Sequence, residues 1–175
     1  MQYGVELFPY QRIKKIKNEE KKQKFQELSD VFKIISYFVA AFLVGRVLMV
    51  NLMAPFGIAY LIAIIVSENN KISLVSGIGT LLGYISLYNN VKNLPVYFIV
   101  TATLLVLNYI LKNIEQKKKL SLIFFSIFLE FLLYKLLIVK LSLAIGFLTS
   151  FFEITCIFPL YFIIHYSIIC FKELK

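Results

Sequence analysis

The sequence predicts an all-α fold, that of a polytopic helical membrane protein with about six transmembrane helices. Of its 175 residues, 59% are hydrophobic, and the mean hydropathy is +0.79. A soluble domain contains about 45–50% apolar residues. The apolar residues form long blocks that short polar clusters separate, as in chains that cross a membrane several times. The blocks are too long, and alternate too little with polar residues, for β-strands.

Each expected span is an apolar block of roughly the length that a transmembrane helix needs, about 20 residues. The second block is shorter than this and the sixth is longer, and tilt or an interfacial end absorbs the excess. The six blocks lie at residues 34–53, 54–67, 72–88, 94–111 and 120–139, and within 141–171.

The chain divides into three parts: a basic N-terminal segment at residues 1–33, a transmembrane domain at 34–171 and a tail at 172–175. Because a long charged segment precedes the first apolar block, we expect that block to remain in the membrane rather than to be cleaved as a signal peptide. The charged segment is either a helix attracted to an anionic leaflet or a disordered tail that sets topology.

The basic residues predict the orientation of the chain. If both termini are cytoplasmic and all six helices span, the inside segments carry fifteen of the nineteen Lys and Arg residues. The outside segments carry three, namely Lys92, Lys135 and Lys140. This excess agrees with the positive-inside rule, so we expect an N-in, C-in protein of a bacterial cell membrane.

The net charge of +9 does not indicate nucleic-acid binding. Much of the positive charge lies in residues 12–33 and 112–119, directly beside apolar blocks. Basic residues in such positions set topology and contact anionic lipid. The expected partner is therefore the lipid bilayer.

Four ionisable residues lie inside the expected spans: Arg46, Glu130, Lys135 and Glu153. Each costs at least about 2.5–3.5 kcal/mol at the centre of a bilayer, so each needs a partner or water. Lys135 is near the outer end of its span and can extend to the interface. Arg46 is deep enough to pair with either glutamate, as a helix-packing ion pair or as a proton or substrate site, and the scarcity of other polar residues favours the packing role.

Two local patterns predict how the helices turn and pack. Pro55, Phe56 and Gly57 predict the outer hairpin turn between the first two helices, since proline removes a helix donor and glycine permits a turn. Gly79 and Gly83 form a GxxxG pair, which lets helix backbones approach closely, either within the bundle or against a partner. Two further small-residue pairs have the same spacing: Ala41 with Gly45, and Ala59 with Ala63.

No pattern in the chain indicates an enzyme. The P-loop, GxSxG, HExxH and CxxC patterns do not occur. His165 is the one histidine, and we expect it to be a packing or interfacial residue. Cys156 and Cys170 do not have the spacing of a metal or redox site. We therefore expect no catalytic residues, no metal and no cofactor.

The stretch "FLVGRVLMVNLMAPFGIAYLIAI" (residues 42–64) resembles the start of the membrane region of stage II sporulation protein E. Members of that family have a Gly-Arg pair, an apolar spacer and a Pro-Phe-Gly turn that enters the second helix. Gly45, Arg46, Pro55, Phe56 and Gly57 match this pattern. The first twelve residues, "MQYGVELFPYQR", also resemble family members.

The resemblance implies a membrane domain of about ten spans, a central oligomerising region and a PPM-type serine phosphatase domain. It also implies self-association and a place at the sporulation septum with the tubulin-like division protein. This chain ends at Lys175 after about six spans, and its only aspartate is Asp30. The expectation is a truncated, non-enzymatic anchor that localises to the septum and lacks the phosphatase domain.

Two alternatives remain open. The chain is compatible with a small six-helix transport component, such as the substrate-binding subunit of a vitamin importer. That function needs an outward polar pocket, for which the outer loops offer Asn51, Tyr88, Asn89, Asn90 and Asn93. The other alternative is a helical membrane protein that resembles the sporulation family by chance.

Overall fold

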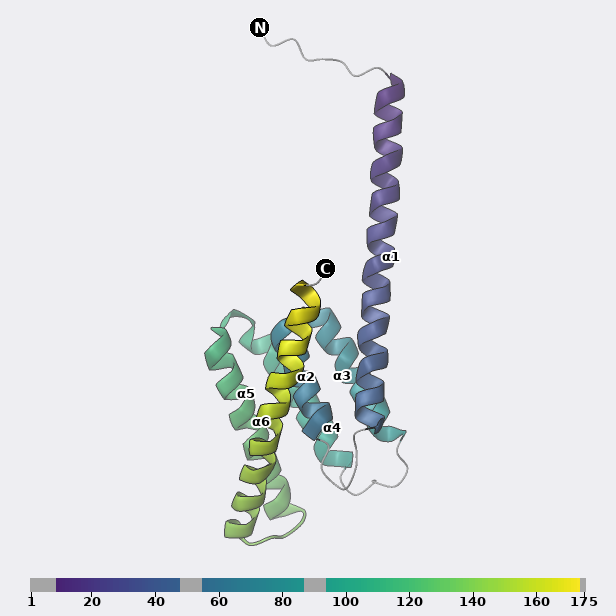
Figure 1. The fold of residues 1–175 in the computed structure, drawn as a ribbon. Coiled ribbons are helices and arrows are strands. Elements are labelled where there is room, and N and C mark those ends of the chain that lie inside the picture. Colours follow the sequence, from purple (N-terminus) through teal and green to yellow (C-terminus); the bar gives the residue numbers. More distant parts are fainter. Residues whose placement is uncertain (1–8, 48–54, 87–93, 174–175) are drawn as a thin grey trace. The chain divides into compact units, whose positions relative to one another are not determined.

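The computed structural model describes residues 9–47, 55–86 and 94–173, and these residues confirm the predicted all-α fold class. Within these ranges, side chains are described from residue 21 onward except at residues 47, 55, 94 and 116. Six α-helices and one short 3₁₀ helix follow one another along the described chain: α1 (Pro9–Val47), α2 (Pro55–Ser67), α3 (Asn70–Ile85), α4 (Leu94–Ile110), η1 (Leu111–Asn113), α5 (Gln116–Leu137) and α6 (Leu143–Glu173) (Figure 1).

The bounds of α2 to α6 lie within four residues of the predicted blocks. The first helix differs, because α1 begins at Pro9 and not near residue 34. The charged segment before the first apolar block is therefore helical from Pro9 on. The expected end of the first span, residues 48–53, lies outside the described residues.

Residues 1–36 and 37–175 form two separate compact units. In the first unit, every described side chain from residue 21 to residue 33 is exposed, including Phe25 at 75% and Phe32 at 72%. This part of α1 therefore has no apolar core of its own. The second unit contains the packed helices.

Four described helical segments are long and apolar enough to cross a membrane: Lys21–Arg46, Pro95–Asn113, Lys117–Leu137 and Leu143–Glu173. The apolar helix at Phe56–Ser67 is shorter. At about 1.5 Å per residue, the 13 residues of α2 extend about 20 Å. This is less than the hydrocarbon thickness of a bilayer, about 30 Å.

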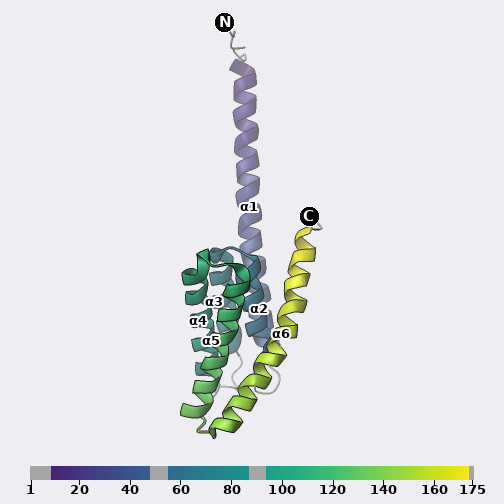
Figure 2. The same cartoon turned by 90° about the vertical axis from the view of Figure 1, so that its left-hand side faces the viewer.

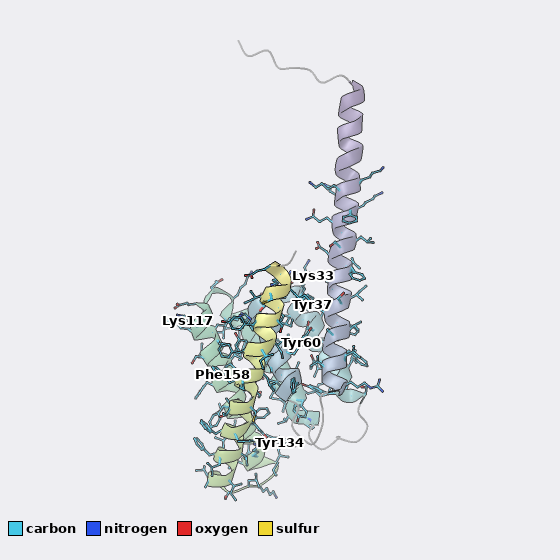
Figure 3. The ribbon with its side chains drawn as sticks, viewed as in Figure 1. Lys33, Tyr37, Tyr60, Lys117, Tyr134 and Phe158 are labelled. Atoms are coloured by element: carbon cyan, nitrogen blue, oxygen red, sulfur yellow. The ribbon has the colours of Figure 1, made fainter. Side chains whose placement is uncertain are left out.

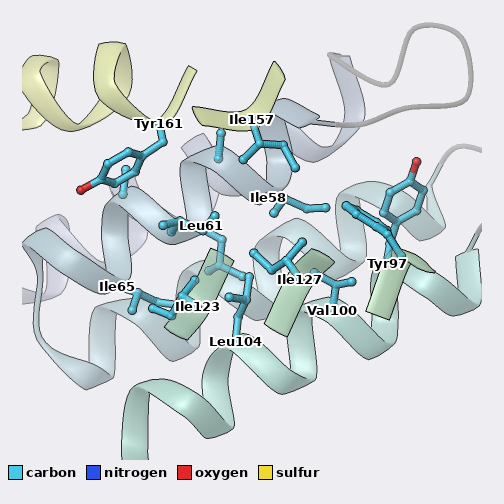
Figure 4. Packing of buried hydrophobic residues seen from close by; sticks show 14 of the residues in the cluster. Ile58, Leu61, Ile65, Tyr97, Val100, Leu104, Ile123, Ile127, Ile157 and Tyr161 are labelled. Carbon is cyan, nitrogen blue, oxygen red and sulfur yellow. The ribbon is translucent and has the colours of Figure 1, made fainter. Parts of the chain in front are cut away.

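Helix α2 is nevertheless the centre of the second unit. Every residue from Ile58 to Ile65 is at most 8% exposed, and α2 contacts α3, α4, α5 and α6. Figure 4 shows three of its side chains, Ile58, Leu61 and Ile65, packed among apolar residues of α4, α5 and α6. Neighbouring helices therefore enclose the middle of α2, whereas α6 keeps a long outer face of aromatic and aliphatic side chains.

Successive helices from α2 to α6 run in alternating directions (Figures 1 and 2). The ends of α2, α4 and α6 and the beginnings of α3 and α5 therefore lie at one end of the bundle, which we call the turn end. The connection between α5 and α6 lies at the other end. Hydrogen bonds that link residues far apart in the sequence confirm this arrangement at the turn end.

Glycines allow the closest approach of the helices. A Cβ atom on Gly83 of α3 would lie 2.6 Å from the carbonyl oxygen of Phe42, and one on Gly79 would lie 2.8 Å from that of Phe38. Both carbonyl groups belong to α1. In the other direction, a Cβ atom on Gly45 of α1 would lie 2.7 Å from the carbonyl oxygen of Thr80 in α3. The GxxxG pair therefore lies in the contact of α3 with α1, inside the chain.

Proline 55 begins α2, where the missing amide hydrogen costs no helical hydrogen bond. Phe56 and Gly57 belong to the first turn of the helix and not to the predicted hairpin turn. A Cβ atom on Gly57 would lie 2.2 Å from the hydroxyl of Tyr84, which is fully buried. Gly57 therefore makes room for a side chain of α3. The turn itself, residues 48–54, lies outside the described residues.

Candidate functional site

The turn between α2 and α3 carries the sequence "SENN" at residues 67–70. Asn69 caps the N-terminus of α3, where its side-chain oxygen accepts a hydrogen bond of 3.0 Å from the amide of Ile72. Glu68 is the only acidic residue between Asp30 and Glu115. The capped turn holds this carboxylate at the turn end, and its side chain is only 4% exposed.

The carboxylate of Glu68 is held by groups from two other helices. The ammonium group of Lys172, near the end of α6, lies 2.9 Å from Glu68 Oε1. The hydroxyl of Tyr37 in α1, which Figure 3 labels, donates a hydrogen bond of 2.8 Å to the same oxygen. A nearly buried carboxylate needs such partners, because desolvation of an unpaired charge is costly.

Ser67 is bound to the same helix, α6, through two groups. Its hydroxyl oxygen lies 2.8 Å from Nδ1 of His165 and shares a hydrogen bond with it. Its carbonyl oxygen accepts a further hydrogen bond from Lys172 Nζ. Tyr161 stacks on His165 with ring centroids 5.4 Å apart, which fixes the imidazole from the side.

A second chain of polar contacts extends from Asn70 to the neighbouring helices. The amide of Asn108 in α4, a residue only 4% exposed, donates to the side-chain oxygen of Asn70 at 3.1 Å. The oxygen of Asn108 in turn accepts from Lys119 Nζ in α5 at 2.7 Å. The ammonium group of Lys119 is therefore directed into the bundle.

We call these residues the turn cluster: Tyr37, Ser67, Glu68, Asn69, Asn70, Asn108, Lys119, His165 and Lys172. They come from all six described α-helices and the turn between α2 and α3, and most of their polar atoms have partners. Among the described residues, no group of three His, Cys, Asp or Glu side chains is placed to bind a metal. The arrangement can bind the ends of α2 to α6 to one another and to α1.

A separate ion pair connects α5 and α6 toward the other end of the bundle. Lys135 Nζ lies 2.8 Å from Glu153 Oε2, and the two side chains are only 12% and 13% exposed. The expectation that Lys135 extends to the interface is therefore wrong, because it points inward to a carboxylate. Glu153 pairs with this lysine and not with Arg46.

Arg46 and Glu130 lie apart from that pair. Arg46 is exposed in the last turn of α1, where a cation interacts favourably with the partial negative charge at a helix C-terminus. Glu130 of α5 is partly buried beside Thr103 of α4. In the described part of the chain, no ion pair joins Arg46 to either glutamate.

Sequence reasoning missed the turn cluster, because it treated residues 67–71 as a plain connection. The available signal was a single acidic residue beside a short, very apolar helix. The importer alternative rests on Asn51, Tyr88, Asn89, Asn90 and Asn93. All five lie outside the described residues.

Comparison with known proteins agrees with the resemblance. The family model for the SpoIIE N-terminal domain matches residues 5–171, nearly the whole chain. The chain belongs to this family. No curated protein and no solved structure matches it.

Membership of the SpoIIE N-terminal domain family ties the chain to sporulation. The matched domain is not the phosphatase domain of the family. Together with the four long apolar helices, it fits a membrane protein and a membrane-anchoring region.

Proposed function

We propose that this chain is a multi-pass membrane anchor that places a SpoIIE-type phosphatase at the sporulation septum and has no catalytic activity itself. The observation that carries the proposal is the family match over residues 5–171. Four long apolar helices supply the membrane attachment. The polar groups of the turn cluster are used to hold helices together, as an anchor requires.

We further propose that all six α-helices cross the membrane and that both termini are cytoplasmic. Lys71, Lys112, Lys119 and Lys172 all lie in or beside elements that meet at the turn end. Lys140, with a positive φ of 58°, lies in the connection at the other end. The positive-inside rule then assigns the turn end to the cytoplasm.

Thiol labelling of intact cells tests this orientation. In a chain whose two native cysteines are replaced by alanine, Lys140→Cys and Lys71→Cys place single thiols at exposed positions of opposite ends. A membrane-impermeant maleimide should label Lys140→Cys in intact cells, and Lys71→Cys only after permeabilisation. The reverse pattern, or labelling of both in intact cells, would contradict the N-in, C-in assignment.

Placement at the septum is tested with a fluorescent protein fused to the chain in a sporulating bacterium. We expect septal fluorescence above that of an unrelated multi-pass protein with the same tag, which corrects for the two apposed septal membranes. Equal septal and lateral signals after this correction would refute the localisation function. The membrane attachment itself would still be visible as a signal at the cell periphery.

A further inference from the structure

A groove of about 460 Å³ lies between α5 and α6 in the half of α5 nearest the turn end. Its apolar lining consists of Leu120 and Phe124 from α5, and Ile154 and Phe158 from α6. Phe158 is 47% exposed. The groove therefore opens on the outer surface of the bundle, where a membrane protein meets lipid.

A lysine marks the turn end of this groove. Lys117, in the first turn of α5, belongs to the lining, and Figure 3 shows it on α5 with Phe158 on α6. Phe124 lies two helical turns further along, about 10 Å deeper at 1.5 Å per residue. The groove thus combines a cation at the membrane surface with an apolar channel that extends into the hydrocarbon region.

Lys117 differs from the two lysines that follow it. Lys118 lies 3.8 Å from Glu115, and both of these side chains are well exposed. Lys119 is directed inward to Asn108. Among the described residues, no ion pair or hydrogen bond joins Lys117 to another side chain, so its charge is available to a ligand in the groove.

We propose that the groove binds an anionic phospholipid, with its phosphate at Lys117 and one acyl chain along the apolar lining. The hydroxyl of Ser121 also lines the groove, one turn deeper than Lys117. This is the depth at which a phospholipid carries its ester oxygens. The ligand chemistry is that of a membrane lipid, and the inference does not depend on placement at the septum.

Charge favours a lipid over a helix of a second copy. A second helix in the groove would have to bring a carboxylate to Lys117. Of the acidic residues inside the candidate spans of α5 and α6, Glu130 and Glu153 are partly buried, and only Glu173, in the last turn of α6, is exposed. An anionic lipid supplies its negative charge at the membrane surface, where Lys117 is placed.

Fluorescence quenching by brominated lipids tests the proposal, because the chain contains no tryptophan. Phe158→Trp introduces a single reporter in the groove. Phe125→Trp is the matched control, since Phe125 is 64% exposed, next to Phe124, and not part of the lining. Both variants are reconstituted in vesicles that contain brominated phosphatidylglycerol or brominated phosphatidylcholine at equal mole fractions.

We expect phosphatidylglycerol to occupy the groove about fivefold more strongly than phosphatidylcholine, the effect of about one lysine near the surface. The tryptophan at position 158 should report this preference, and the tryptophan at position 125 should not. Adding Lys117→Ala should remove the preference, whereas Lys117→Arg and Lys118→Ala should keep it. The conservative Lys117→Arg variant shows whether loss of the preference follows loss of the charge.

Three results would overturn the proposal. The preference could persist in the Lys117→Ala variant, or it could be equal at positions 158 and 125, as a general surface potential would produce. Quenching at position 158 by neither lipid would show that protein, such as a second copy, covers the groove.

Discussion

Helices α2 and α6 are both strongly apolar, but the bundle uses them in opposite ways. α2 has 13 residues, and its central eight are buried. α6 has 31 residues, and large side chains such as Phe151, Phe152 and Ile163 are more than half exposed. Because lipid is as apolar as leucine, hydropathy cannot separate the two cases. The difference lies in which helix the others surround.

Residue size explains part of this difference. α2 places small residues, Gly57, Ala59 and Ala63, on its buried surface. Small residues let neighbouring helices approach closely and give dispersion contacts that lipid does not replace. α6 instead carries phenylalanines on its outer surface. The α2 region therefore supplies the packed core, and α6 supplies much of the contact with the surroundings.

The largest expected effect is a truncation in the core of α2. Ile62 is fully buried, so Ile62→Ala should leave a cavity and lower the free energy of unfolding by about 2–5 kcal/mol. Ile163→Ala in α6 removes the same atoms from a side chain that is 64% exposed. Its effect should be below about 1 kcal/mol. Denaturation in detergent micelles measures both, and equal losses would remove the distinction between the two helices.

A smaller effect is expected where the end of α6 is bound to the end of α2. Glu68→Gln removes the charge that pairs with Lys172 but keeps an oxygen for Tyr37. Because Lys172 is 44% exposed and can be solvated, the free energy of unfolding should fall by only about 1–3 kcal/mol. Glu115→Gln is the control, since its exposed pair with Lys118 should contribute less than about 1 kcal/mol.

The effect of Glu68→Gln can also be measured by hydrogen exchange along α6. In Glu68→Gln the last turns of α6 should exchange amide hydrogens faster, while the part of α6 near Leu143 should not change. Hydrogen exchange with peptide mapping measures this. If exchange rose uniformly along α6, the turn cluster would not stabilise the contact between the ends of α2 and α6 locally.

A pair of glycine substitutions should differ by an amount no larger than that of Glu68→Gln. Alanine is better than glycine in a helix by about 1 kcal/mol. At Gly146 of α6 the new Cβ atom would meet Leu136 Cδ2 at an ordinary 3.4 Å, so Gly146→Ala should be neutral or stabilising. At Gly57 of α2 it would lie 2.2 Å from the hydroxyl of Tyr84, whose ring lies against that of Tyr97 at a tilt of 34°. Gly57→Ala should therefore lower the free energy of unfolding by about 1–3 kcal/mol. If Gly146→Ala and Gly57→Ala changed the melting temperature by the same amount, the close packing assigned to Gly57 would be contradicted.

The sequence predicted α2 to α6 well, because the length of an apolar block and the polar residues between blocks determine where those helices begin and end. It did not predict the start of α1, whose charged first half is also helical. It also predicted close packing at Ala41, Gly45, Gly79 and Gly83, the residues at which α1 and α3 meet. The family could be recognised from one stretch with a Gly-Arg pair and a Pro-Phe-Gly sequence.

The polar partnerships could not be predicted in the same way. Depth along a helix axis follows from residue number, but the direction of a side chain around that axis depends on which helices are neighbours. On depth alone Arg46 was expected to pair with either Glu130 or Glu153, yet Glu153 faces Lys135 of the adjacent helix. Ser67 and His165 are 98 residues apart in sequence, and only the folded arrangement brings them together.

The most direct test of this account is to map contact with lipid by using a phospholipid that carries a photoreactive diazirine on its acyl chain. The chain is reconstituted with this lipid, irradiated and digested, and the modified residues are located by mass spectrometry. We predict adducts on α6, at residues such as Phe151, Phe152 and Ile163, and none from Ile58 to Ile65 of α2. Adducts of similar yield on both helices would contradict the claim that α2 is enclosed by the other helices.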